Sequence, residues 1–250
     1  TMMITILFFG VILTGLIAEF FSKKLERFKD LIISFSVSIV LTLICVHILP
    51  EIFSHEDFGI GYYLLAGFLI QILLELLSKG IEHGHIHMYG KINQNQLFMI
   101  FIGLSIHSFI EGLPINTIES VQHNHHLHSD YSNDNHFSWL YLFMILIHKL
   151  PIAAVLIFFL NSIGLSDIKK YGLLIVFAST SPIGALFGEK LVQFSFFNDW
   201  SLKFLAISCG MLLHITTQLI FEDHHQSKNK TNNIITISLG IVTGVLLFSF

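Results

Sequence analysis

A histidine and a glutamate lie four residues apart inside an apolar run of this sequence. The stretch LSIHSFIEGLPI, from Leu104 to Ile115, carries His107 and Glu111. On an α-helix, residues i and i+4 lie about 40° apart around the axis and about 6 Å apart along it, so the two side chains share a face. Neutral imidazole and carboxylate are good ligands for Zn²⁺ and other first-row divalent ions. The pair therefore predicts part of a metal site.

A second polar pair interrupts the apolar run that follows. His148 and Lys149, in the stretch LIHKLPIAA, fall near the middle of an expected helix. With His107 and Glu111, His148 supplies three ligands from two neighbouring helices, and water or another group completes the shell. A bound cation would offset the cost of burying Glu111, because an ionisable group inside a membrane is expensive and indicates a functional site by default.

Other polar groups in apolar runs carry a weaker signal. A lone intramembrane histidine is often a hydrogen-bonded packing residue, and this alternative stays open for His148 taken alone. His214 is expected to be structural or to line a pathway, and His47 to lie at an interface or entrance. Glu75, one turn from the end of its run, is expected to extend its carboxylate into solvent.

The composition is that of an integral membrane protein. Of the 250 residues, 53% are hydrophobic and only 12% are charged, and the mean hydropathy is +0.73. A soluble domain has about 25% charged residues. The formal net charge of -4, without a dense basic patch, gives no reason to expect a nucleic-acid partner. The cysteines, Cys45 and Cys209, lie in apolar runs and are expected to be small packed residues, not a disulfide or a zinc site.

Apolar runs of about 20 residues are long enough to span a bilayer as helices. They predict an all-α integral membrane fold, with one polytopic domain over residues 1–250. The first run has its basic cluster behind it, so it is expected to be a membrane helix and not a cleaved signal peptide. The eight candidate spans are 2–21, 31–52, 60–78, 97–117, 138–160, 171–190, 202–221 and 234–250.

Lysine and arginine are unequally shared between the two sides of these spans. The loops after the first, third, fifth and seventh spans hold ten of them, whereas the other side holds only Lys190 and Lys203. Short loops rich in Lys and Arg face the cytoplasm. Both termini are therefore expected outside, in a plasma membrane or a bacterial inner membrane.

Two loops between the spans are rich in histidine. One is the expected cytoplasmic loop at 80–96, and the other is the expected extracytoplasmic loop at 118–137. Both are polar and are expected to be mobile and to capture metal weakly. Their candidate ligands are His83, His85, His87, His123, His125, His126 and His128.

Several motifs together resemble the ZIP (Zrt/Irt-like) family of divalent metal transporters, over essentially the whole chain. HSFIEGLP at 107–114 is similar to the family's His-x-Phe-x-Glu-Gly signature, and HKLPIAA at 148–154 falls where the family has its second metal-binding motif. HILPE at 47–51 is similar to the LLPE ending of the family's second helix. TSPIGALFG at 180–188 resembles its Pro-Leu/Ile-Gly motif.

The resemblance implies eight helices in an inverted 3+2+3 arrangement, with the fourth and fifth at the centre. It implies inward movement of Zn²⁺ by alternating access through a mid-membrane site. It makes His107 and Glu111 the ligands of the fourth helix and His148 the first ligand of the fifth. Ser108 stands where many members have asparagine. The transported substrate would be Zn²⁺, with Fe²⁺, Mn²⁺ and Cd²⁺ as alternatives, and no prosthetic group is expected.

The sequence departs from the two-metal pattern of many members of the family. Lys149 and Ile152 occupy positions that are acidic in the fifth helix of those members, and Ser181 stands where some have a glutamate in the sixth. The Lys149 ammonium is expected to replace the second cation electrostatically. A site for a single metal ion is therefore predicted, with Ser108 and Ser181 as further candidates for its lining.

Two other classes of membrane protein use similar residues. A membrane metallohydrolase would use the same ligands to activate water, but no HExxH helix is present and no spare intramembrane carboxylate remains as general base. A cation-efflux antiporter would have six spans and a large soluble domain. A homodimer stays open, because GxxxG-like surfaces are too weak to assign one. Protonation of histidine near pH ~6.5 is expected to weaken metal binding and make uptake pH-sensitive.

Overall fold

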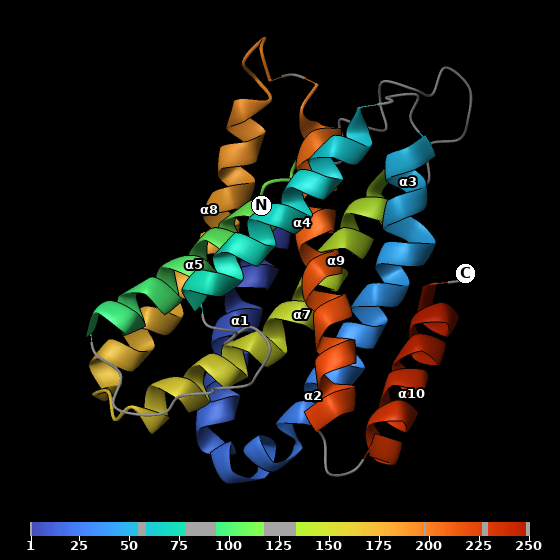
Figure 1. Ribbon diagram of the computed structural model, residues 1–250. Helices are drawn as coiled ribbons and strands as arrows, with labels where there is room; N and C mark the ends of the chain where they lie inside the picture. Colours follow the sequence, from blue (N-terminus) through green and yellow to red (C-terminus); the bar gives the residue numbers. More distant parts are fainter. Residues whose placement is uncertain are drawn as a thin grey trace.

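The computed structural model describes residues 2–54, 59–78, 94–117, 134–197, 199–226 and 230–248, and every regular element in these ranges is a helix (Figure 1). The chain runs through α1 (Met2–Phe20), α2 (Ser22–Leu43), the π-helix η1 (Ile44–Ile48), α3 (Leu49–Ser54), α4 (Ile60–Ser78), α5 (Gln94–Gly112), α7 (Asp134–Ser162), α8 (Asp167–Leu191), α9 (Ser201–Gln226) and α10 (Lys230–Phe248).

The long helices agree with the expectation of a multi-pass membrane protein. Within the described residues, six helical spans are long and apolar enough to cross a bilayer, and α10 contributes a shorter apolar stretch. α5 is less apolar, because it begins with three polar residues and carries His107 and Glu111. Residues 94–96, in the expected loop at 80–96, begin α5, and residues 134–137, in the expected loop at 118–137, begin α7. The rest of both expected loops lies outside the described residues.

Two prolines shape the ends of the expected spans. The second span continues to Ser54 through η1, where the Leu49 N–H donates to the carbonyl of Ile44, five residues back. Pro50 follows and has no N–H to donate, which favours a local widening of the helix. The expected span 97–117 is wrong at its end, because α5 stops at Gly112 and Pro114 lies in the tight turns that follow.

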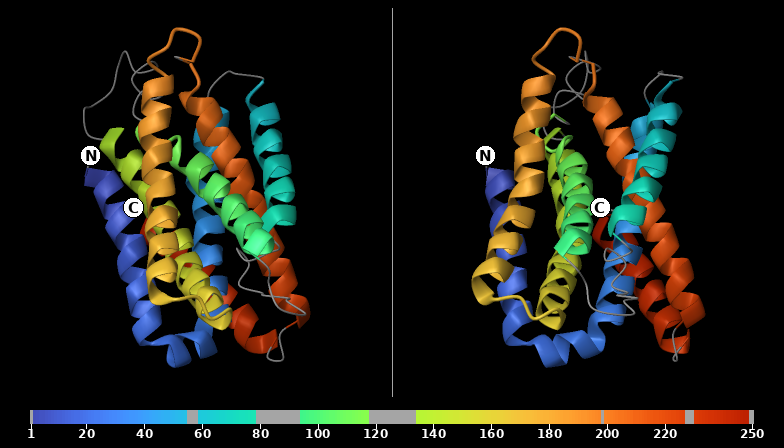
Figure 2. Two further views of the ribbon diagram at one scale, coloured as in Figure 1. Left: turned by 90° about the vertical axis from the view of Figure 1, so that its left-hand side faces the viewer. Right: turned by 60° about the vertical axis from the view of Figure 1, so that its left-hand side comes forward.

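The helices form two bundles that stand side by side (Figure 2, right). We call α1, α5, α7 and α8 the first bundle, within which α1 packs on α7 and α8, and α5 packs on α8. The second bundle is α2, α4, α9 and α10, within which α4 packs on α9 and α2 packs on α10. The two bundles meet mainly where α2 contacts α7 and α4 contacts α5.

Glycines bring helices of one bundle to backbone contact. A Cβ added at Gly184 of α8 would lie 2.1 Å from the Phe109 carbonyl oxygen of α5, and one at Gly67 of α4 would lie 2.0 Å from the Ile207 oxygen of α9. These distances are far below van der Waals contact, and a backbone oxygen cannot swing aside as a side chain does. Glycine is therefore required at both positions by the close approach of the helices.

A buried lysine joins three helices of the first bundle near the α7–α8 connection. The Nζ of Lys170 in α8 lies 2.7 Å from Glu19 Oε1 of α1, 3.0 Å from Asp167 Oδ1 and 3.0 Å from Asn161 Oδ1 of α7. The Lys170 side chain is 3% exposed, whereas Asp167 is 81% exposed. The carboxylate of Glu19 is therefore its main counter-charge inside the bundle.

Replacing Lys170 by methionine should lower the free energy of unfolding by about 1.5–3 kcal/mol, the range for hydrogen bonds to charged groups. Thermal unfolding of the purified protein in detergent measures the change. Lys169→Met is the matched control, because Lys169 is exposed and should tolerate the change. Equal unfolding temperatures for the two variants would show that the buried network contributes no net stability.

Candidate metal centre

Three ionisable side chains meet between the C-terminal part of α5 and the middle of α7. His107 and Glu111 come from α5 and His148 comes from α7. One ligand atom from each residue lies within 4.8 Å of the other two, and the Nε2 of His107 is 4.0 Å from Glu111 Oε2. The three residues are 1–2% exposed. Two imidazoles and a carboxylate at this spacing suit a first-row divalent cation, with water or another group as the fourth ligand.

The α5 side of this cluster is fixed by the helix period and by a capping contact. His107 and Glu111 are one turn apart, so they face the same way. Just beyond them α5 ends, and its Glu111 carbonyl accepts a hydrogen bond of 2.9 Å from the Tyr141 hydroxyl of α7. The Tyr141 oxygen also lies 2.7 Å from Ser208 Oγ of α9. The end of α5 is thereby tied to both bundles.

On the α7 side, a proline inside the helix opens its hydrogen-bond ladder beside His148. Pro151 has no N–H, so the carbonyl of Ile147 loses the donor four residues ahead. That carbonyl accepts a hydrogen bond of 2.6 Å from Ser36 Oγ of α2 instead. A freed carbonyl in a membrane helix is tolerated where a neighbouring helix satisfies it, and here the neighbour belongs to the other bundle.

Lys149 also approaches the Glu111 carboxylate, at the same oxygen that His107 approaches. Its Nζ is 3.8 Å from Glu111 Oε2, and it is 5.0 Å from the centre of the Phe177 ring. It is 1% exposed, so it is a fully buried cation beside a buried carboxylate. A cation in this position partly neutralises Glu111 and makes a second metal ion at the same place electrostatically unfavourable.

The hydroxyl groups around Lys149 are arranged to accept its protons. Nζ donates to Ser108 Oγ and to Ser181 Oγ. The Ser181 hydroxyl donates a hydrogen bond of 2.6 Å to the Ser108 carbonyl. The Thr180 hydroxyl donates one of 2.6 Å to the Phe177 carbonyl. Ser108 Oγ also contacts Thr180 Oγ1, which can accept its proton. The hydroxyls of Ser108 and Ser181 thus each keep a lone pair toward the ammonium.

Ser108 and Ser181 are accordingly placed around the lysine ammonium, although the sequence suggested them for the lining of the metal site. The candidate centre therefore has two parts that share Glu111. One part holds the two imidazoles and the other holds the ammonium with its hydroxyl acceptors. Among the described residues, Glu111 Oε1 is a buried acceptor without a hydrogen-bond partner. Leaving such a group unsatisfied costs about 1–3 kcal/mol, and a metal ion bound there would remove that cost.

Two expectations from the sequence are wrong. Glu75 does not extend into solvent, because its Oε2 is 3.0 Å from His214 Nε2 and its Oε1 accepts a bond of 2.6 Å from Gln218 Nε2, both on α9. His214 is held by this contact and by a ring contact with Phe68.

The second wrong expectation is that both cysteines are packed: Cys209 is buried, but Cys45 is exposed. An apolar run in a membrane protein does not separate lipid-facing from packed positions, because lipid is itself apolar.

Sequence reasoning missed three residues that reach the candidate centre: Gln71, Ser36 and Tyr141. Gln71 was detectable, because it is a polar residue in the middle of an apolar span. His47 lies half-buried in η1. The seven candidate ligands of the histidine loops fall outside the residues that the structure describes: His83, His85, His87, His123, His125, His126 and His128.

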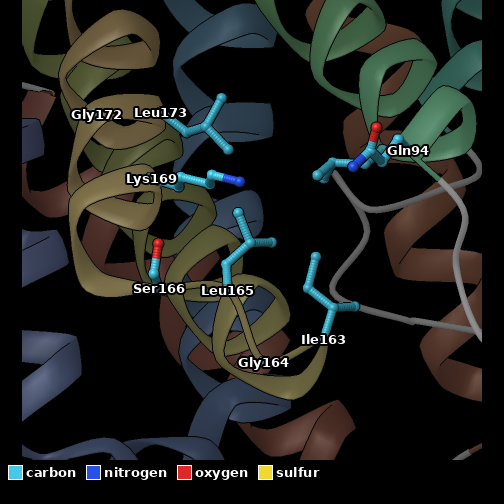
Figure 3. Close-up of a pocket in the computed structure, with 9 residues that line it drawn as sticks. Gln94, Ile163, Gly164, Leu165, Ser166, Lys169, Gly172 and Leu173 are labelled. Atoms are coloured by element: carbon cyan, nitrogen blue, oxygen red, sulfur yellow. The ribbon is translucent and has the colours of Figure 1, made fainter.

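A cavity of about 770 Å³ lies near the start of α5 and the α7–α8 connection (Figure 3). It is separate from the three-residue cluster, since His107 is thirteen residues, or roughly 20 Å, further along α5 than the cavity-lining Gln94. Lys169 is the charged side chain among its lining residues and points into it (Figure 3). The Lys169 ammonium repels a divalent cation. The charge of the described lining residues therefore does not favour passage of a metal ion through this cavity.

Comparison with known proteins finds a matching family model and a curated relative. The family model described as ZIP Zinc transporter matches residues 82–250, which include all three clustered residues. "Zinc transporter ZIP1" of Plasmodium falciparum (isolate 3D7) is 29% identical over 132 residues, which make up 53% of this chain and 32% of that protein. The aligned part therefore spans about a third of the length of that relative.

Proposed function

Because this chain belongs to the ZIP zinc transporter family, we propose that it carries Zn²⁺ into the cytoplasm by alternating access through a site formed by His107, Glu111 and His148. The observation that carries the proposal is the meeting of three buried ligand atoms, from α5 and α7, within 4.8 Å. Members of this family are transporters and not enzymes, so the hydrolase alternative is set aside.

The packing of the helices supports an inverted 3+2+3 arrangement. In such an arrangement α1 corresponds to α8, α2 to α9, α4 to α10, and α5 to α7. The contact between α1 and α7 should then have an equivalent between α8 and α5, and the contact between α2 and α10 should have an equivalent between α9 and α4. All four contacts are present. Eight spanning helices related in this way are typical of transporters with a mid-membrane site.

The positions of the connections support the proposed orientation. The α1–α2 and α7–α8 connections, the end of α9 and the start of α10 gather at one end of the molecule, and the α8–α9 connection lies at the other (Figure 2, left). The first end is the one with most lysine and arginine in the sequence. We assign it to the cytoplasm, which places both termini outside, in a plasma membrane or a bacterial inner membrane.

A single Zn²⁺ fits the charges of the candidate centre. Two neutral imidazoles and one carboxylate favour Zn²⁺ over harder ions such as Mg²⁺. Lys149 already holds the position of a second positive charge beside Glu111. The ion would shed most of its water on entry, and the buried ligands would replace that water. Seven loop histidines, outside the described residues, are proposed to concentrate metal by weak ligation on either side.

All three proposed ligands belong to the first bundle, so the site moves with that bundle as a unit. The second bundle contacts it through side chains on α2 and α4. Movement of one bundle against the other would expose the site first to one side and then to the other. The ligands need not separate during this movement, because α5 and α7 keep their positions within one bundle.

The test is uptake of radioactive zinc into vesicles that contain the purified protein. Wild-type protein should give saturable uptake, and His148→Ala should lower it more than tenfold, because a lost ligand leaves two. Zinc titration of the same preparations should give one tightly bound ion for the wild type. Unchanged uptake by His148→Ala at equal protein content would overturn the proposed site, and two tightly bound ions per chain would overturn the single-metal model.

A further inference from the structure

A glutamine of the second bundle contacts a proposed ligand of the first. Gln71 lies in the middle of α4, is fully buried, and places its Oε1 2.8 Å from His107 Nδ1. α4 packs on α9 within the second bundle, whereas His107 is on α5. This hydrogen bond therefore crosses from one bundle to the other at the candidate centre.

The contact decides which imidazole nitrogen of His107 carries the proton. The amide oxygen of glutamine only accepts hydrogen bonds, so Nδ1 must donate, and Nε2 keeps its lone pair. Nε2 is the nitrogen that lies 4.0 Å from Glu111 Oε2. With the amide turned round, its NH₂ group would donate to Nδ1, and Nε2 would then carry the proton. Only the first arrangement leaves His107 able to bind a metal through Nε2.

We propose that Gln71 is a positioning residue that holds His107 in its metal-binding tautomer and orientation. Because Gln71 belongs to the opposite bundle, it holds His107 only while α4 and α5 keep their present relation. Zinc affinity is then tied to the relative position of the bundles, and movement that separates Gln71 from His107 releases the ligand for exchange. The proposal rests on the proposed function, in which His107 binds Zn²⁺.

Two substitutions at Gln71 separate positioning from packing. Gln71→Leu keeps a similar volume and removes the acceptor, and it should weaken zinc binding by roughly 10–100-fold, as the loss of an outer-shell partner does. Gln71→Glu keeps an acceptor for Nδ1–H and should bind zinc within a few-fold of wild type. Dissociation constants come from competition with a zinc-sensitive dye in detergent, with the unfolding temperature measured in parallel.

Gln218→Leu is the matched control. Gln218 is also an intramembrane glutamine, and it donates to Glu75 away from the three-residue cluster. This variant should leave the dissociation constant for zinc unchanged even where it lowers stability. In vesicles, Gln71→Leu should raise KM and leave kcat equal or higher, because movement of the bundles no longer breaks the hydrogen bond to His107.

A zinc affinity of Gln71→Leu equal to wild type would overturn the proposal. Equal weakening by Gln71→Leu and Gln71→Glu, with equal loss of thermal stability, would also overturn it and assign Gln71 to packing alone. Should neither variant fold, ¹⁵N spectra of histidine-labelled wild-type protein still decide, because the proposal requires a protonated Nδ1 on His107. Wild-type zinc affinity in His107→Ala would instead reject the proposed function itself.

Discussion

Glu111→Gln should weaken zinc binding by more than the roughly 10–100-fold expected for the loss of an outer-shell partner. The amide keeps the shape of the carboxylate but removes its charge, and Glu111 is the only carboxylate within the three-residue cluster. Zinc uptake into vesicles should fall to the level of protein-free vesicles. Glu189→Gln is the matched control, because Glu189 is exposed and its carboxylate contacts only the Asn116 amide among the bonds described.

The same substitution should also reduce stability. It leaves Lys149 as a buried cation without its carboxylate, and breaking a buried pair in this way costs about 3–5 kcal/mol. The double variant Glu111→Gln, Lys149→Met removes both charges and should recover much of that stability without recovering zinc affinity. Recovery of zinc binding in the double variant would contradict the assignment of Glu111 as a ligand.

Gly184→Ala should strongly disrupt the first bundle, although it adds a single carbon atom. Its Cβ would lie 2.1 Å from the Phe109 carbonyl oxygen, so α5 and α8 must move apart. Overpacking of this kind costs about 1–3 kcal/mol or more. That corresponds to a fall in unfolding temperature of roughly 2–12 °C for a chain of this size. Separation of the helices would also draw Ser181 away from Ser108, so Lys149 would lose part of its set of hydroxyl acceptors.

Gly172→Ala is the matched control for this prediction. It changes the same helix by the same atom, but nothing lies within 4 Å of the added Cβ. Alanine favours a helix over glycine by up to about 1 kcal/mol, so this variant should be as stable as wild type or more stable. Detergent unfolding curves of the two variants measure the contrast. Similar curves would show that the close approach of α5 and α8 is not a constraint on the fold.

The helical membrane fold and the meeting of the three proposed ligands were predictable from the sequence. Hydropathy locates long helices, and the helix period alone puts His107 and Glu111 on one face. The approach of His148 on α7 to these two side chains is a tertiary contact. The sequence indicated it only through the resemblance to a family. Hydropathy did not find the end of α5, because Leu113 and Ile115 continue the apolar run past the point where Pro114 ends the helix.

The partners of the polar groups were not predictable. Gln71 stands out as a polar residue in an apolar span, but periodicity on one helix cannot say which group on another helix it meets. The same limit applies to Glu75, whose partners His214 and Gln218 lie well over a hundred residues away in the sequence. The sequence showed that the positive charge of Lys149 needs compensation, but not which groups provide it. The hydroxyl acceptors come together only through the packing of α8 on α5.

The glycine contacts within each bundle have a mechanical consequence. Helices that touch through backbone atoms, as α5 and α8 do at Gly184, have no side-chain layer that can deform. The contacts between the bundles run through side chains such as Ser36 and Gln71, which can rotate. A change in bilayer thickness loads all the spanning helices at once. Because the helices within a bundle cannot shift against each other, the two bundles would shift against each other instead. Membrane thickness would therefore change the rate of metal movement.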